Sequence, residues 1–340
     1  MPLPMVAASC LLAVAHQSMH LRSDVRELPD AGMFEGLPQA WDGASVLGND
    51  PKGSAENFTM KDGPYLAGAS PPLLVIRAYS DAISDHIRSE GVWFDCPVLG
   101  EIWDKLPCPP SSPQCTKNFM DIGANIGACS LQMMARNDVA HTFAFEPNYA
   151  NLFYLTRSIL GNNMSQRVSL FPQALGDAPG QHRIYERPGN MGSTALDASN
   201  YGNGTASGEV AMVTLDSLMV AAGMPYVHLA KMDVEGYEMK VLAGASNVLS
   251  SGMVHAWKVE LSPAFLELHN SSALHLLNAF ITNRYDLYHV AGWEDRKANL
   301  ELMSREVLRN YACEAHPRNY QREFLAVLHG QQARSPLACA

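Results

Sequence analysis

The stretch Asp121-Ile-Gly-Ala-Asn-Ile-Gly127 decides the fold of this chain. It continues an apolar run of strand length that begins at Asn118. It precedes a helical pattern in which Ala128, Leu131 and Ala135 recur at positions i, i+3 and i+7. Its glycines let a backbone approach a ligand where a Cβ would collide with it. We therefore predict a strand, a ligand-binding turn and a helix, in that order.

The chain beyond Lys117 repeats this alternation. Apolar runs of strand length are separated by helical patterns, which is typical of a parallel sheet covered on both faces. The predicted strands span 118–122, 142–145, 168–171, 226–232, 254–259, 285–290 and 322–328. Residues 181–186 and 209–213 are predicted to form a hairpin or an edge pair around a loop rich in Gly, Asn and Ser. The pattern favours an α/β fold with a doubly wound, seven-stranded sheet.

The region before Lys117 is rich in Gly, Pro, Ser and Asp and shows no sustained period. Within it, residues 73–89 are predicted to form one helix, and the aromatic residues of 92–106 are predicted to pack on a core. We expect four segments along the chain: a signal or disordered segment (1–20), an N-terminal extension or cap (21–115), the sheet domain (116–330) and a tail (331–340).

Two acidic residues follow successive predicted strands. Asp121 would repel a pyrophosphate but would pair well with an ammonium group, whereas the N-terminus of the next helix suits a carboxylate. The ligand is therefore expected to carry both charges, as a free amino acid does. Glu146 lies 23 residues after Gly123, where a carboxylate can accept hydrogen bonds from both hydroxyls of a ribose. Either acid alone could be a solvated loop residue or a helix N-terminal charge, but their joint spacing favours a binding site.

A third group of charges lies at the end of the predicted strand 226–232. Lys231, Asp233 and Glu235 are costly there, because central parallel strands are normally apolar. Ligands in open α/β sheets bind outside the carboxyl ends of the strands. The alternative is a structural network that caps the next helix, which suits Glu235 better than Asp233.

Taken together, these motifs resemble the FkbM family of methyltransferases. The resemblance rests on Asp121-x-Gly-Ala-Asn-x-Gly127 and on five further motifs in the same order, and it covers about residues 117–290. These are Phe145-Glu-Pro-Asn148, Ala174-Leu-Gly-Asp177, Thr214-Leu-Asp216, Lys231-Met-Asp-Val-Glu-Gly-Tyr-Glu238 and Val259-Glu-Leu261. The closing Glu323-Phe-Leu-Ala-Val327 also resembles the last strand of that family.

The resemblance implies a class I methyltransferase fold, which is Rossmann-like, with strand order 3-2-1-4-5-7-6. It also implies S-adenosylmethionine as methyl donor and often a hydroxyl as acceptor, here of a small molecule or a glycan. Donor-binding residues are then expected in the motifs at the ends of the first three strands. They are Asp121, Gly123, Asn125, Gly127, Glu146, Pro147, Asn148 and Ala174.

Methyl transfer to a hydroxyl gains from a base that takes the proton of the acceptor. Asp233 is the first choice for that base, or for a residue that orients the acceptor. Glu235 is the second choice and Glu260 the third. Asp233 and Glu235 could hold a divalent cation, since hard oxygens suit magnesium, but no further ligand set supports a metal site.

Two other functions fit parts of the pattern. An NAD-dependent oxidoreductase would place a glycine at position 125, where this chain has Asn125, and would not favour Asp121 beside a pyrophosphate. A non-catalytic, lumenal binding module could share the fold, because fold alone does not define function.

The composition of the chain argues against nucleic acid as a partner and against a membrane span. The net charge is −10 and only 17% of residues are charged, so the chain is poorly suited to neutralising nucleic-acid phosphates. No apolar run reaches the ~18–20 residues of a membrane span. Oligomeric state is left open.

The location of the protein depends on a short N-terminal apolar stretch and on the cysteines. Residues 5–15 end in Ala13-Val14-Ala15, which resembles a signal cleavage site, but no Lys or Arg precedes Arg22. Removal of Cys10 with such a signal would leave six of the seven cysteines, an even number. Cys108 and Cys115 flank a short Pro-rich loop that a disulfide could close. We expect a secretory or extracellular location, and otherwise a cytoplasmic one.

Overall fold

The computed structural model describes residues 55–61, 70–108, 115–187, 189–197, 205–221, 223–290, 300–314, 316, 320–329 and 333–339. All of them belong to one compact unit, Trp41–Ala340. The predicted signal or disordered segment, residues 1–20, therefore lies outside the described residues.

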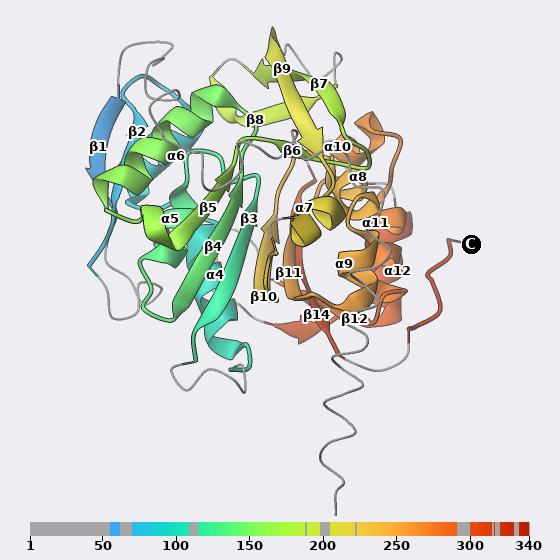
Figure 1. Cartoon of the computed structure of the whole chain (residues 1–340). Coiled ribbons are helices and arrows are strands. Elements are labelled where there is room, and N and C mark those ends of the chain that lie inside the picture. Colours follow the sequence, from blue (N-terminus) through green and yellow to red (C-terminus); the bar gives the residue numbers. More distant parts are fainter. Residues whose placement is uncertain are drawn as a thin grey trace, which may run out of the picture. The chain divides into compact units, whose positions relative to one another are not determined.

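A large sheet organises the described chain (Figure 1). Its strands lie in the order β13-β12-β14-β11-β10-β3-β4-β5. The bounds are β3 Lys117–Ile122, β4 Val139–Phe145, β5 Val168–Phe171, β10 Val227–Met232, β11 Val254–Leu261, β12 Tyr285–His289, β13 Glu301–Leu302 and β14 Arg322–Leu328. The strands β5, β4, β3, β10 and β11 are parallel, and β14 runs antiparallel to both β11 and β12. Apart from the two-residue edge strand β13, this is the 3-2-1-4-5-7-6 order, so the predicted fold class is confirmed.

Helices cover this sheet in two groups (Figure 1). One group contains α4 (Cys96–Lys105), α5 (Ala128–Met134) and α6 (Tyr149–Gly161), and α5 contacts both of the others. The other contains α7 (Leu215–Ala221), α8 (Glu238–Ala243), α9 (Ser246–Ser251), α11 (Ala273–Ile281) and α12 (Arg305–Cys313). The short helix α10 (Pro263–Leu268) follows β11. The Asn148 side chain caps α6, by accepting a hydrogen bond from Ala150 N.

A second, four-stranded sheet has the order β6-β9-β7-β8. Its strands are β6 Ala174–Leu175, β7 Gly180–Arg187, β8 Asn190–Leu196 and β9 Thr205–Val213. The predicted pairing of 181–186 with 209–213 is confirmed, because β7 and β9 are antiparallel. The predicted loop between them is wrong over 190–196. Burial alternates along β8, where Met191, Ser193 and Ala195 are buried. The sequence shows no alternation of apolar and polar residues here, because most residues of β8 are small or polar.

The prediction of one helix over 73–89 is also wrong. Leu73–Arg77 forms strand β2, which pairs antiparallel with β1 (Ala55–Thr59), and helix α3 (Ala82–Glu90) follows. Leu74, Val75 and Ile76 are buried at successive positions, which an amphipathic helix would not give. The Asp81 side chain starts α3 by accepting a hydrogen bond from Ser84 N.

The N-terminal extension shares the core of the sheet domain. Leu74 and Ile76 of β2 and Trp103 of α4 are fully buried in one apolar cluster with Phe119 of β3 and Leu155 of α6. The predicted packing of the aromatic residues in 92–106 on a core is confirmed for Trp103. The extension and the sheet domain therefore bury their apolar surface together.

Candidate active site

A cavity of about 620 Å³ opens where β3, β4, β10 and β11 end. Its floor includes Asp121, Glu146, Asp233 and Glu260, one from the end of each strand or the residue just beyond it. The second sheet and the N-terminal extension supply further walls. Parallel strands bring their carboxyl ends to one edge, so residues far apart in sequence meet there, as the motif spacing predicts.

The glycine turn after β3 has the conformation that its sequence predicts. Gly123 has φ +84°, and a Cβ there would collide with the main-chain carbonyl of Asp233. Asn125 adopts φ +53° and donates its main-chain N–H to the Glu146 carboxylate. Gly123 and Asn125 line the cavity. Gly127, just before α5, is not among the cavity-lining residues of the described chain; a Cβ there would meet the Leu155 side chain.

Asp121 is fully buried beneath this turn. One carboxylate oxygen accepts a hydrogen bond from Ser130 Oγ at 2.6 Å, and the other lies 3.8 Å from Lys231 Nζ. Burial raises the pKa of the Asp121 carboxyl. Lys231 also contacts Asp233, at 3.2 Å. Burial alone would lower the pKa of Lys231, but Asp233 and Asp121 outweigh it and raise the pKa, so Lys231 remains charged between them.

Glu146 lies at the end of β4 and accepts hydrogen bonds on both oxygens. One comes from Asn125 N at 2.7 Å, and another from Asn148 N at 2.9 Å. The Asn151 side-chain amide donates a third at 3.2 Å. Burial nevertheless raises the pKa of Glu146 to about 7. The carboxyl is therefore fixed in position, and its charge changes near neutral pH.

Three further predicted donor-site residues are distributed around Glu146. Pro147 and Ala174 line the cavity. Asn148 is buried and, within the described chain, is not among the cavity-lining residues. Its side chain caps α6 and donates to Glu186 of β7 at 2.9 Å. The structure therefore gives Asn148 a role in joining α6 to the second sheet.

The predicted acidic residues of the reaction centre all line the cavity. The Asp233 side chain is 36% exposed, and Glu235 has φ +55° in the turn after β10. One buried carboxylate oxygen of Glu260 has no hydrogen-bond partner within the described residues. Burial, followed by the charges of Asp233 and Glu235, raises the pKa of Glu260 well above its usual range.

The structure also contains functional candidates that the sequence analysis missed. Glu238 holds the turn after β10, by accepting hydrogen bonds from Val234 N and Gly236 N at 3.2 and 3.3 Å. Burial raises the pKa of Glu238 to about 7. Acidic residues are common in the first turn of a helix, so the position of Glu238 at the start of α8 indicates its role in the turn only weakly.

The N-terminal extension contributes a wall of the cavity that the sequence did not predict. Trp93, Phe94 and Asp95 line it, and the two aromatic rings lie 4.4 Å apart between centroids. Asp95 is buried and pairs with Lys258 of β11, which also pairs with Glu323 of β14. Burial alone would raise the pKa of Asp95, but Lys258 lowers it to about 2.

The described cysteines form three disulfides. Cys108 pairs with Cys115 and Cys313 with Cys339. Cys96 of α4 pairs with Cys129 of α5, two residues after the glycine turn. Among the described residues, no group of three or more His, Cys, Asp and Glu side chains is arranged to hold a metal ion. None of the described helices is long and apolar enough to cross a membrane.

Comparisons with known proteins find similarity to methyltransferases. Residues 121–287 match the model of the methyltransferase FkbM domain. A hexuronic acid methyltransferase, AglP of Haloferax volcanii, is 28% identical over 131 residues, which cover 38% of this chain. The match spans 51% of that relative, or about half of its length.

Two solved structures of methyltransferases are also similar. One is the methyltransferase FkbM of Methylobacillus flagellatus, with a TM-score of 0.38 and 16% identity, covering 62% of this chain and 43% of that one. The other is a human methyltransferase 10 domain containing protein, with a TM-score of 0.37 and 10% identity, covering 72% and 94%. The strand order, the glycine turn with Glu146 and the domain match together show that residues 121–287 form a methyltransferase FkbM domain.

Proposed function

We propose that this protein transfers the methyl group of S-adenosylmethionine to a hydroxyl of a small molecule or glycan. The observation that carries the proposal is Glu146, a carboxylate fixed by the main-chain N–H groups of Asn125 and Asn148 beside the glycine turn of β3. That arrangement leaves a carboxylate facing a cavity at the point where a ribose would be recognised. When bound, S-adenosylmethionine supplies an electrophilic methyl group on a sulfonium.

The residues of the cavity fit this donor. Its volume of about 620 Å³ is within the usual range for a small-molecule site. The close approach of Gly123 to the chain after β10 leaves no room for a Cβ. The first turn of α5 presents main-chain N–H groups, which suit a carboxylate. Asp121 keeps one buried oxygen without a hydrogen bond within the described chain, which suits an ammonium group near Lys231.

The acidic residues of β10 and β11 supply groups for the acceptor. Asp233 is partly exposed and can accept a proton or orient a hydroxyl. Lys231 holds Asp233 in place through their contact at 3.2 Å. Burial and the neighbouring acidic charges raise the pKa of Glu260 well above its usual range, which favours its protonated form and makes it a poorer choice for the base. Asp233 therefore remains the first choice for the base, ahead of Glu235 and Glu260.

A sugar is the acceptor class that the cavity supports best. The half-buried rings of Trp93 and Phe94 offer apolar faces, and the carboxylates beyond β10 and β11 offer hydrogen-bond acceptors to hydroxyls. Arg187 and Arg322 also line the cavity and can receive an anionic substituent. The similarity to a methyltransferase of hexuronic acids supports the same class.

A calorimetric titration tests the donor. We expect the protein to bind S-adenosylhomocysteine, and Glu146→Ala to weaken that binding by ~1.5–3 kcal/mol, which is the range for charge-assisted hydrogen bonds. NAD is the matched control, because an oxidoreductase would bind it with the same carboxylate. Binding of NAD without binding of S-adenosylhomocysteine would replace the methyltransferase proposal by the oxidoreductase.

A further inference from the structure

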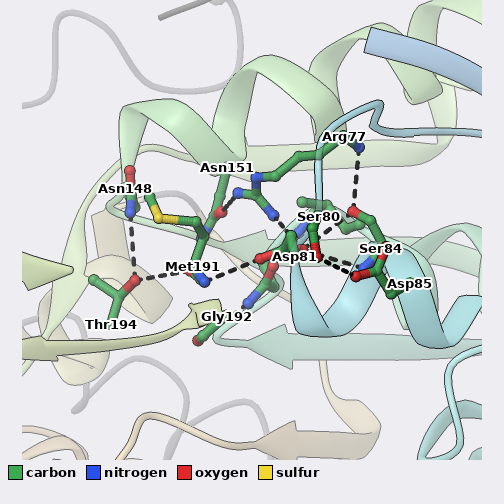
Figure 2. Close-up of polar contacts among 12 residues, drawn as sticks. Arg77, Ser80, Asp81, Ser84, Asp85, Asn148, Asn151, Met191, Gly192 and Thr194 are labelled. Atoms are coloured by element: carbon green, nitrogen blue, oxygen red, sulfur yellow. Dashed lines mark hydrogen bonds and ion pairs between the residues drawn. The ribbon is translucent and has the colours of Figure 1, made fainter. Parts of the chain in front are cut away.

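A buried ion pair of the N-terminal extension, Arg77 with Asp81, lies beside Asn151 of α6 (Figure 2). Arg77 is the last residue of β2 and is fully buried. Its guanidinium lies 3.3 Å from the carboxylate of Asp81, which is 1% exposed and caps helix α3. The ring of Tyr154 in α6 lies under the same guanidinium, with its centroid at 4.8 Å. The extension therefore places a fixed positive charge inside the protein.

The same guanidinium reaches the donor site through one side chain. Arg77 Nη2 donates a hydrogen bond to Asn151 Oδ1 of α6. The amide nitrogen of Asn151 in turn donates to Glu146 Oε1 at 3.2 Å. An amide whose oxygen is held by a guanidinium cannot rotate, so its nitrogen stays directed at the carboxylate. Figure 2 shows Asn151 between Arg77 and the start of α6.

Asp81 extends the connection to the second sheet. Its other carboxylate oxygen accepts a hydrogen bond from the main-chain N–H of Met191 in β8, at 3.0 Å. The next residue, Gly192, accepts a hydrogen bond from the Asn125 side chain at 3.2 Å and lines the cavity. A Cβ at Gly192 would collide with Ile83 of α3, so β8 lies tightly against the extension.

A buried ion pair is weak evidence for stability, because removing both charges from water offsets much of their attraction. The position of this pair next to Glu146 and β8 points to another role. We propose that Arg77 is a positioning residue for the donor site: through Asn151 it fixes the Glu146 carboxylate, and it favours the charged form of that group. The inference rests on the proposed function, in which Glu146 holds the ribose of the donor.

The charge of Glu146 is the property that Arg77 would control. Burial raises the pKa of Glu146 to about 7, and the positive charge of Arg77 acts in the opposite direction. The acidic groups nearby are Asp81, which pairs with Arg77, and Glu186 of β7, which is connected to Glu146 by two hydrogen bonds that Asn148 donates. On the β3 side, Asp121 pairs with Lys231. Loss of Arg77 should therefore raise the pKa of Glu146 further.

The test is the pH dependence of S-adenosylhomocysteine binding between pH 6 and 8.5, measured by calorimetry. The variant Arg77→Met with Asp81→Asn removes both charges of the pair, so no lone buried charge remains. Asn151→Leu removes the two hydrogen bonds that connect Arg77 to Glu146 and leaves the ion pair of Arg77 and Asp81 intact. This variant tests the proposal if the first one does not fold. Arg136→Met is the control, because it removes a buried arginine that pairs with Asp104 and Asp138 and does not line the cavity within the described chain.

We expect both test variants to bind about 5-fold more weakly than the wild type at pH 7 and to recover most of the charge-dependent loss at pH 8.5. A rise of about one unit in the pKa of Glu146 gives this change in the charged fraction. The control should bind like the wild type at each pH. Unchanged binding, or an equal loss at every pH, would overturn the role of Arg77 while leaving the donor assignment intact. A wild type that does not bind S-adenosylhomocysteine would instead overturn both.

Discussion

Lys231 lies between two carboxylates at the centre of the site, 3.8 Å from Asp121 and 3.2 Å from Asp233. The sequence predicts that Asp121 pairs with an ammonium group of the ligand, yet the ammonium group of Lys231 is already beside it. One lysine that serves two carboxylates leaves each of them incompletely neutralised. Asp121 can therefore still attract a cation, and Asp233 can still act on an acceptor.

The first residue-scale prediction concerns Asp233. Asp233→Asn keeps the shape of the side chain but removes its charge and its ability to accept a proton. We expect kcat to fall by ~10²–10⁴, the range for general base catalysis, while affinity for S-adenosylhomocysteine changes less than in Glu146→Ala. Glu260→Gln is the matched comparison and should lose less, because burial raises the pKa of Glu260 and favours the protonated form, which cannot act as a base. Near-normal turnover of Asp233→Asn would move the role to Glu235 or to positioning alone.

Residues that act alone at the end of a strand could be predicted from the sequence. Gly123 and Glu146 follow predicted strands at a spacing that parallel-sheet topology converts into proximity. Arg77 and Asp95 could not be predicted, since each becomes meaningful only through a partner far away in the chain, such as Asn151 or Lys258. No local pattern encodes those pairings.

At the scale of elements, prediction succeeded where hydrophobic period and length agree. Strand β14 has the bounds predicted from sequence, 322–328. Prediction failed where the conformation of a short segment depends on the strand that pairs with it. The segment of β2 is a strand because it pairs with β1, and the segment of β8 is a strand because it pairs with β7. An apolar run of four residues fits a helix or a strand equally well until its partner is known.

The disulfide between Cys96 and Cys129 leads to an element-scale prediction. It joins α4 of the extension to α5, which begins at the glycine turn. Replacement of both cysteines by alanine should lower the free energy of unfolding by about 2–4 kcal/mol, measured by urea denaturation, because the open loop gains entropy when unfolded.

The disulfide between Cys108 and Cys115 is the control for loop length. It closes a sequence separation of 7 residues, against 33 for the other. Its removal should cost about 1 kcal/mol less. Equal losses for the two double variants would show that strain or packing, rather than chain entropy, determines the contribution of each bridge.

For the whole molecule, the paired cysteines bear on location. We propose that the protein resides in an oxidising compartment, because six cysteines paired in three disulfides suit secreted or lumenal proteins. Mass spectrometry of alkylated protein from its native compartment should find all six blocked until a reductant is added. Free thiols at both Cys108 and Cys115 would place the protein in the cytoplasm instead.

Three buried carboxyls of the folded molecule change charge at or above neutral pH, which is unusual for glutamate. Burial raises the pKa of Glu146 and of Glu238 to about 7, and burial with the charge of Asp95 raises that of Glu323 to about 8. Above pH 6 these carboxyls are already ionised in the unfolded chain, whose pKa values are near 4.5. The folded state therefore holds more protons than the unfolded state, and its stability must fall as pH rises.

Buried histidines make the free energy of unfolding rise with pH, but only at lower pH. Burial lowers the pKa of His228 to about 4, so its contribution is lost as pH falls below about 6.5 and is constant above it. We therefore expect the free energy of unfolding to decrease by about 2–4 kcal/mol between pH 6.5 and 8, measured by urea denaturation without reductant. Glu238→Gln keeps an acceptor for Val234 N and removes one titrating group, so its decrease should be smaller than that of the wild type. A stability that is flat or rising over this interval would mean that these carboxyls are ionised in the folded protein, and Glu146 would then need no help from Arg77 to carry its charge.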